Sequence, residues 1–304
     1  MSNRAPELAF KQMSSDPKKL ALAYAECRRI ALGHYENFPV GSILLPEHVR
    51  PHFFALYAFM RTADDLADLP YRPSNERLQA LAEWRRELHR SFDPQVPDDE
   101  LNPIFRALRY TCREYELSPK PFERLLDAFE YDAAGHVRFE GYDDLLGYCS
   151  NSADPVGELV LALFGYRDRE RIMLSNSICS GLQLLNFCQD VREDVENGRY
   201  YFAMSDLSRL GLAAPDRLRD PASAQKAVLM QMDHVRRLLR AGAPLTERVT
   251  GRLRYELRAV VFGAMAMLRK LEQSGGRSFE VRPKLSKLGH LAILVKSLVS
   301  SPRP

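Results

Sequence analysis

The chain has 304 residues, of which 45% are hydrophobic and 27% charged, and its formal net charge is +3. This composition is typical of a soluble globular protein and excludes a disordered or fibrous chain. No basic block interleaved with aromatic residues occurs, which excludes nucleic acid as the main partner.

The cysteines and the N-terminal segment indicate a compartment. The five cysteines are dispersed and include no C-x-x-C pair, which favours a reducing environment over a disulfide framework. Residues 1–20 lack the apolar core of a signal peptide, and no apolar run approaches the ~20 residues that cross a bilayer. We therefore expect a cytoplasmic protein.

Helical periodicity dominates the sequence, without strand-like alternation or a fixed repeat. The pattern predicts one all-α domain over residues 1–304, with a flexible segment at 1–15 and a C-terminal helix and tail at 284–304. The expected helices cover residues 17–33, 51–69, 75–90, 104–117, 120–134, 142–165, 169–198, 222–242, 246–276 and 284–299.

Capping residues and prolines set several of these boundaries. Asp16, Ser74 and Asp220 stand where an N-cap is expected. Pro155 falls inside the predicted helix 142–165 and removes a backbone donor, so we expect a kink there.

A first acidic stripe lies in the segment 55–69, ALYAFMRTADDLADL. Side chains four residues apart share a helix face, which places Asp64 and Asp68 together. Arg61 precedes Asp64 by about one turn, and Tyr57 precedes Arg61 by one turn. The same apolar helix therefore carries an aromatic, a basic and two acidic side chains on one face.

A second stripe lies in the predicted helix 169–198. Asn186, Asp190 and Asp194 are spaced four and four, and Gln183 lies about one turn before Asn186. Like charges at this spacing repel by about 0.2–0.5 kcal/mol, so two such stripes call for a compensating charge. Mg²⁺ prefers oxygen ligands and binds through one or two carboxylates plus phosphates. A solvated acidic surface is the alternative, and spacing alone leaves both open.

Both stripes resemble the motifs of one known family. RTADDLAD at 61–68 resembles the R-x-x-D-D-x-x-D motif of the squalene/phytoene synthases. NFCQDVREDVENGRYYF at 186–202 resembles their second motif, N-x-x-x-D-x-x-x-D followed by G-R-x-Y. The likeness extends from about residue 21 to about residue 287.

Finer features resemble the hydroxysqualene synthases of bacterial hopanoid biosynthesis. They are HYENFPVGS at 34–42, YCSNSADPVGELVL at 148–161, NFCQDV at 186–191 and RPKLSK at 282–287. Presqualene-forming and carotenoid-type members usually carry V-A-G in the second of these blocks. The chain departs from the family pattern at Ala203 and Gly289, outside the acidic stripes.

The resemblance implies an isoprenoid synthase fold around a central cavity. It implies Mg²⁺ as cofactor, with Asp64, Asp68, Asn186, Asp190 and Asp194 as ligands. It implies substrate or diphosphate contacts for Ser42, Tyr57, Arg61, Gln183, Asn186, Arg199 and Tyr201. The catalytic group would be Arg61, Asp64, Asp68, Asp190 and Asp194. Candidate aromatic residues for the cavity wall are Phe53, Phe54, Phe59, Phe129, Phe187 and Tyr200, although for any one of them ordinary core packing is the favoured explanation.

The activity that this resemblance implies is hydroxysqualene synthesis. Presqualene diphosphate would lose diphosphate, and water would capture the rearranged cation, positioned by Gln183 or by residues 150–154. The alternatives are a head-to-head prenyl synthase that forms presqualene diphosphate, squalene or phytoene, and a catalytically silent scaffold protein. Presqualene diphosphate is the expected ligand, and neighbouring pathway enzymes are candidate partners. The tail either lies peripherally on the inner membrane or packs on the core.

Overall fold

The computed structural model describes residues 16–33, 45–69, 72–135, 137–212 and 214–302. The predicted flexible segment 1–15, the motif at 34–42 and its Ser42 lie outside the described residues. Within the described ranges the chain is helical, and its single β-type pairing is an isolated bridge between Phe139 and Ala203. The all-α prediction is confirmed.

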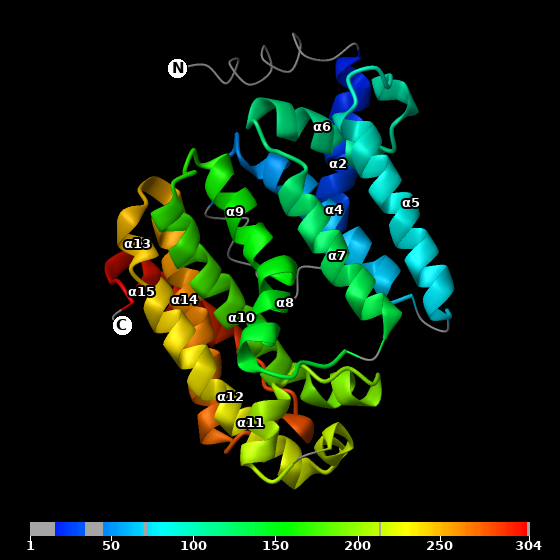
Figure 1. Cartoon of the computed structure of the whole chain (residues 1–304). Coiled ribbons are helices and arrows are strands. Elements are labelled where there is room, and N and C mark those ends of the chain that lie inside the picture. The colour runs from blue at the N-terminus through cyan, green and yellow to red at the C-terminus, as the bar shows by residue number, and fades with distance from the viewer. Residues whose placement is uncertain (1–15, 34–44, 70–71, 136, 213, 303–304) are drawn as a thin grey trace. The chain divides into compact units, whose positions relative to one another are not determined.

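The helices follow one another along the chain in the order that Figure 1 labels. They are α2 (Pro17–Gly33), α4 (Arg50–Ala67), α5 (Ser74–Phe92), η1 (Asp98–Glu100), α6 (Pro103–Glu114), α7 (Lys120–Ala134), α8 (Tyr142–Ser152), α9 (Asp154–Leu163), α10 (Arg169–Glu196), α11 (Met204–Arg209), η2 (Pro215–Arg219), α12 (Pro221–Gly242), α13 (Leu245–Arg248), α14 (Gly251–Gln273), η3 (Arg277–Phe279) and α15 (Lys287–Val299).

Two of the three predicted caps are confirmed. The Asp16 carboxylate accepts from the backbone N–H of Lys18 at 3.0 Å, and Asp220 caps α12 by accepting from the N–H of Ser223 at 2.9 Å. The prediction for Ser74 is wrong. Its hydroxyl donates to the carbonyl of Ala133 at 2.6 Å, because a tertiary acceptor lies within reach.

Two predicted helices are each divided in two. Residues 142–165 form α8 and α9, with Ala153 between them at φ −128° and ψ −47°. Pro155 therefore lies in the first turn of α9, where its missing N–H costs no helical hydrogen bond. Residues 246–276 form α13 and α14. The chain is extended at Thr250 and turns at Gly251 with φ +63°, a conformation that favours glycine.

The chain forms two compact units, which are described separately. Unit 1 comprises residues 1–133 and 159–166, and unit 2 comprises residues 134–158 and 167–304. The prediction of a single domain stays a prediction.

Unit 1 is organised around α2, α4, α5 and α6, which pack on one another. Its centre is the ring of Phe59, which is fully buried and packs against Trp84, Phe105 and Phe122 at centroid distances of 5.2–6.0 Å. Buried aromatic pairs in these arrangements contribute about 0.5–1.5 kcal/mol beyond their area. Phe59, a candidate for the cavity wall, is therefore a core residue of this unit.

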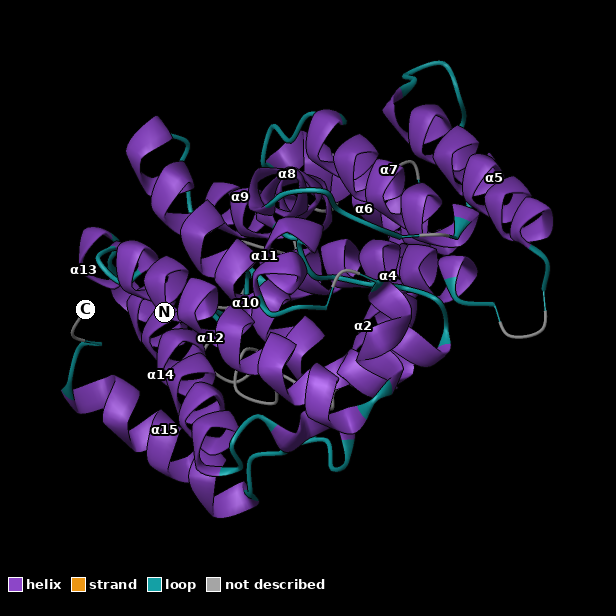
Figure 2. Ribbon diagram, turned by 60° about the horizontal axis from the view of Figure 1, so that its bottom comes forward, coloured by secondary structure: helices purple, strands orange, loops and turns teal. Residues whose placement is uncertain are grey.

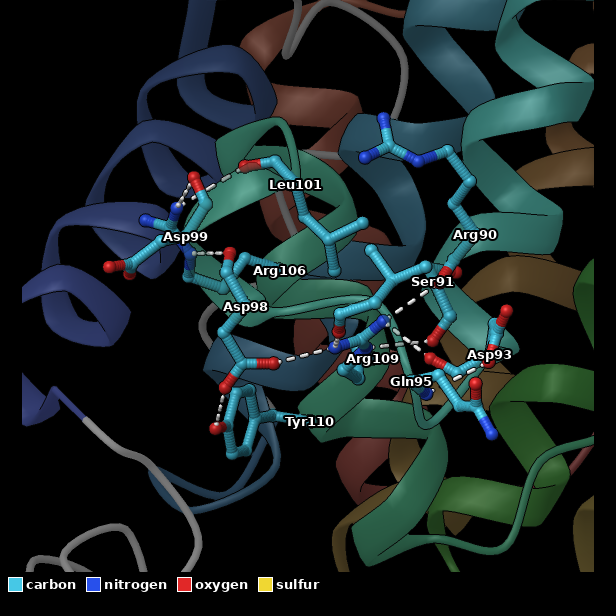
Figure 3. Close-up of polar contacts among 11 residues, drawn as sticks. Arg90, Ser91, Asp93, Gln95, Asp98, Asp99, Leu101, Arg106, Arg109 and Tyr110 are labelled. Atoms are coloured by element: carbon cyan, nitrogen blue, oxygen red, sulfur yellow. Dashed lines mark hydrogen bonds and ion pairs between the residues drawn. The ribbon is translucent and has the colours of Figure 1, made fainter.

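A buried arginine joins α5, η1 and α6 in unit 1. All five N–H groups of Arg109 are used, on the carbonyls of Arg90, Ser91, Asp93 and Val96 and on the Asp98 carboxylate, at 2.7–2.9 Å. Figure 3 shows this guanidinium inside the loop that follows α5. The carbonyls at the end of α5, which have no partner within the helix, are satisfied in this way.

Unit 2 is built on α10 and α12, whose long contact is its most extensive. Both views show the two helices side by side (Figures 1 and 2). At their crossing, a Cβ added at Gly242 would lie 2.7 Å from the carbonyl oxygen of Leu174. The close approach therefore depends on glycine at that position.

Candidate functional site

The first stripe lies on the partly exposed face of α4. The opposite face is buried in unit 1, which explains why a strongly apolar helix can carry carboxylates. The Arg61 guanidinium pairs with Asp64 at 3.2 Å and with Asp65 at 2.6 Å. Asp68 stands at the C-cap, and its backbone N–H donates to the Asp64 carbonyl. Arg61 and Asp64 are thus in contact, as their spacing predicts, and Asp68 follows at the end of the same helix.

The second stripe lies on α10 in unit 2. Asn186 is exposed, whereas the side chains of Asp190 and Asp194 are only 26% and 14% exposed. The Arg199 guanidinium lies 3.7 Å from Asp194, and the Arg199 backbone N–H donates to the Asp194 carbonyl at 2.8 Å. The turn after α10 thereby brings Arg199, a predicted diphosphate contact, next to Asp194, the last aspartate of the second stripe.

A segment that follows η3 contacts the middle of the second stripe. Arg282 pairs with both carboxylate oxygens of Asp190, one of them at 3.0 Å from Nη2. Next to it, the Gln189 amide donates to the Pro283 carbonyl at 3.3 Å, and Lys270 donates to the Lys284 carbonyl. We call residues 282–284 the strap, because three contacts hold it against α10 and α14.

The strap includes a residue of the site to which the sequence assigned no role. RPKLSK resembled a family block, but Arg282 and Asp190 are separated by 92 residues, so no local pattern pairs them. Asp65 was likewise assigned no role, although its position four residues after Arg61 is a spacing typical of helical ion pairs.

An aromatic cluster adjoins the second stripe within unit 2. The rings of Phe187 and Tyr201 stack face to face at 3.9 Å with an interplanar angle of 2°, and Phe139 and Tyr148 lie beside them. Tyr201 is 4% exposed, and Gln231 donates to its carbonyl at 3.2 Å. A predicted substrate contact and a predicted wall residue are therefore in direct contact.

The break between α8 and α9 contains a buried carboxylate. Asp154 is 5% exposed and accepts from the Ser180 hydroxyl of α10 at 2.9 Å. Burial and the nearby Asp154 charge raise the pKa of Cys149, so this thiol stays protonated and is not a nucleophile. Asp154, the last residue of the predicted polar segment 150–154, thus contacts α10, whose next turn carries Gln183.

The residues predicted to bind metal are divided between the units. Asp64 and Asp68 belong to unit 1, and Asn186, Asp190 and Asp194 belong to unit 2. Within the described part of the chain, no group of three or more His, Cys, Asp or Glu side chains is arranged to hold a metal ion. That the two stripes face one another stays a prediction.

The donor chemistry of each stripe nevertheless fits Mg²⁺. Both offer carboxylate oxygens, and the second stripe adds the amide oxygens of Gln183 and Asn186, which are the ligands of a hard cation. All three cysteines of unit 2 have raised pKa values because they are buried. Asp64, Asp190 and Asp194 are each met by an arginine. A metal ion would therefore share these carboxylates with the arginines that already pair with them.

This fold and these stripes define an all-helical protein with paired aspartate motifs. The sequence profile of the squalene/phytoene synthase family matches residues 32–289. The chain belongs to the squalene/phytoene synthase family.

Named relatives divide among several activities. The chain is 30% identical over 187 residues to a presqualene diphosphate synthase of Rhodopseudomonas palustris, a match covering 62% of this chain and 64% of that one. It is 33% identical over 195 residues to a hydroxysqualene synthase of Zymomonas mobilis, covering 63% of each. The chain thus spans somewhat less than two thirds of the length of these curated relatives.

Solved structures give fuller coverage. The crystal structure of squalene synthase HpnC from Alicyclobacillus acidocaldarius is 37% identical, with a TM-score of 0.76 over 86% of this chain and 97% of that one. A dehydrosqualene synthase, 23% identical with a TM-score of 0.81 over 92% and 97% of the two chains, shares the fold. The predicted isoprenoid synthase fold is confirmed.

Proposed function

We propose that this protein is a hydroxysqualene synthase, which converts presqualene diphosphate and water to hydroxysqualene and diphosphate. Family membership supports prenyl diphosphate chemistry in general. The observation that carries the particular choice is the buried Asp154–Ser180 pair at the break between α8 and α9. A reaction that ends in capture by water needs polar groups in otherwise apolar surroundings, and this pair supplies them.

The proposed diphosphate site uses the two stripes. Asp64, Asp68, Asn186, Asp190 and Asp194 would hold Mg²⁺ through oxygen atoms. Bound Mg²⁺ would neutralise charge on the diphosphate and act as a Lewis acid.

Arginines of this chain would bind the phosphate oxygens directly. Arg61 and Arg199 already lie against stripe aspartates, so a short reorientation of each guanidinium would bring it to a diphosphate bound there. Charge-assisted contacts of this kind fix the leaving group and stabilise it as it departs.

The hydrocarbon part of the substrate would lie against aromatic side chains. The stacked Phe187 and Tyr201 adjoin Asn186 and present π-systems beside the second stripe. Aromatic faces stabilise a nearby cation by about 0.5–2 kcal/mol, which favours the carbocation formed after diphosphate loss. Because this substrate is a lipid, we also propose peripheral contact with the inner membrane and with neighbouring pathway enzymes.

The competing candidate is formation of presqualene diphosphate, squalene or phytoene from simpler prenyl diphosphates. Relatives named presqualene diphosphate synthase and phytoene synthase match at 28–31% identity. Separate incubations with farnesyl, geranylgeranyl and presqualene diphosphates, each with Mg²⁺ or with a chelator, distinguish the two by extraction and mass analysis of lipids.

Hydroxysqualene is expected from presqualene diphosphate alone, and only with Mg²⁺. A C30 or C40 product from farnesyl or geranylgeranyl diphosphate would establish the competing activity. No turnover of any substrate, together with full cellular function of the Asp64→Ala and Asp190→Ala variants, would favour a silent scaffold protein.

A further inference from the structure

Helix α15 exposes a continuous apolar surface. Five large hydrophobic side chains are between 50% and 78% exposed, and four of them recur at intervals of three or four residues along the helix, with the fifth next to the last of these. They are Leu288, Leu291, Val295, Leu298 and Val299. Helical spacing places all five within about half of the circumference. We call these five residues the α15 ridge.

The opposite side of α15 is more polar than the ridge. This helix packs on α14 in unit 2, as Figure 2 shows. The side turned away from the ridge carries Gly289, His290 and the fully buried Ser297, together with the partly exposed Ile293 and Leu294. A helix whose only task is to cover a core has its apolar residues on the packed side. Packing on α14 therefore does not explain why α15 carries the apolar side chains of the ridge.

The exposed hydrophobic residues are also concentrated in this part of the molecule. Of the eleven large hydrophobic side chains that are exposed in the described residues, five belong to the α15 ridge and Val281 precedes it closely. Single exposed hydrophobic residues are normal, whereas a contiguous set marks an interaction surface.

The charges around the ridge indicate what it binds. From residue 281 to residue 304 the sequence has no Asp or Glu. Lys287 and Lys296 lie at the two borders of the ridge, and the Lys296 ammonium is 4.3 Å from the centroid of the Phe262 ring. Lysines that border an apolar helix face can extend to headgroups while the apolar side chains enter the acyl region.

We propose that the α15 ridge docks the protein on an anionic lipid surface, with the helix lying in the plane of the interface. Apolar area supplies one part of the affinity, and the surrounding lysines supply an electrostatic part that favours anionic lipids by about 1 kcal/mol per charge near the surface. Within the described residues, no helix is both long enough and apolar enough to traverse a bilayer, which agrees with contact at one face. The inference does not depend on which reaction the protein catalyses.

Vesicle flotation of the full chain tests this directly. Vesicles of phosphatidylcholine alone and of phosphatidylcholine with phosphatidylglycerol are compared at low and high salt. We expect the chain to float with the anionic vesicles at low salt, with less bound at high salt. The Leu291→Glu/Val295→Glu variant should bind the anionic vesicles at least about tenfold more weakly. It loses apolar burial, and its added carboxylates are repelled by the anionic lipid.

A matched control substitutes an exposed leucine elsewhere. Leu22 on α2 is 70% exposed, so Leu22→Glu makes the same chemical change without touching the ridge, and it should bind as the wild type does. Circular dichroism melts of both variants verify folding. The Lys287→Gln variant should weaken the preference for anionic lipid and keep its melting temperature.

Three results would overturn the proposal. These are no flotation of the wild-type chain, equal flotation with neutral vesicles, and wild-type binding by the ridge variant. Concentration-dependent dimerisation that the ridge variant abolishes, without vesicle binding, would assign the ridge to a second copy of the chain instead.

Discussion

The contact between the strap and the second stripe makes a quantitative prediction about metal binding. Arg282 pairs with both oxygens of Asp190, a residue that we propose as a Mg²⁺ ligand. The guanidinium and the cation compete for one carboxylate. Removing the guanidinium in Arg282→Gln should therefore increase the affinity of the metal-binding site, provided that Asp190 is a ligand.

The size of the effect follows from the geometry of the ion pair. The pair is two-pronged, but its side chains are 42% and 26% exposed, so solvent screens it. Pairs of this exposure contribute about 1 kcal/mol, near the upper end for surface salt bridges. Release of that competition corresponds to roughly fivefold tighter metal binding.

Calorimetric or electron paramagnetic titration with Mn²⁺, in the presence of inorganic diphosphate, measures this affinity without turnover. Arg192→Gln is the matched control, because Arg192 lies on the same helix and pairs with Glu196 at 2.9 Å rather than with the stripe. It removes the same charge and should leave the affinity nearly unchanged. Unchanged or weaker binding in Arg282→Gln, or equal gains in both variants, would refute the reasoning.

Three further predictions concern stability, pH and product. Arg109→Ala should destabilise unit 1 by about 3–5 kcal/mol in urea unfolding, because four carbonyls and a carboxylate lose their donor. Arg86 is mostly exposed, so the control Arg86→Ala should change the urea midpoint little. Burial, reinforced by the charge of a neighbouring histidine, lowers the pKa of His52 to about 4. Its stabilising contribution is therefore complete above pH ~6.5 and falls by about 3 kcal/mol towards pH ~4, so His52→Gln should reduce the pH dependence of unfolding over that range. Asp154→Asn should leave the fold intact and reduce hydroxysqualene formation about a hundredfold. Unchanged hydroxysqualene formation, measured by mass spectrometry, would exclude a role of Asp154 in positioning the water.

The sequence predicts the secondary structure well where local rules decide it. Apolar periodicity indicates the helices, and Asp16 and Asp220 act as caps because an N-cap needs only the residues that follow it. The Ser74 hydroxyl departs from the local rule because the Ala133 carbonyl, 59 residues away, is a competing acceptor. Gly251 shows the same limit, since only the fold reveals its positive φ.

The contacts of the candidate site are likewise of two kinds: those within one helix can be predicted from spacing, and those between elements cannot. Asp64 with Arg61, and Asp190 with Asp194, could be grouped from helical spacing because each group lies on one helix. The contacts of Arg282 with Asp190 and of Ser180 with Asp154 join different elements, so only tertiary structure identifies them. The assignment of both stripes to one diphosphate site rests on the family resemblance.

A crystal structure with Mg²⁺ and an unreactive thiodiphosphate analogue of the substrate tests the central proposal most directly. The account predicts that Asp64 or Asp68 of α4 and Asp190 or Asp194 of α10 coordinate ions on the same diphosphate, with Arg282 displaced from Asp190. A diphosphate bound elsewhere, or the two stripes turned separately into solvent, would contradict it.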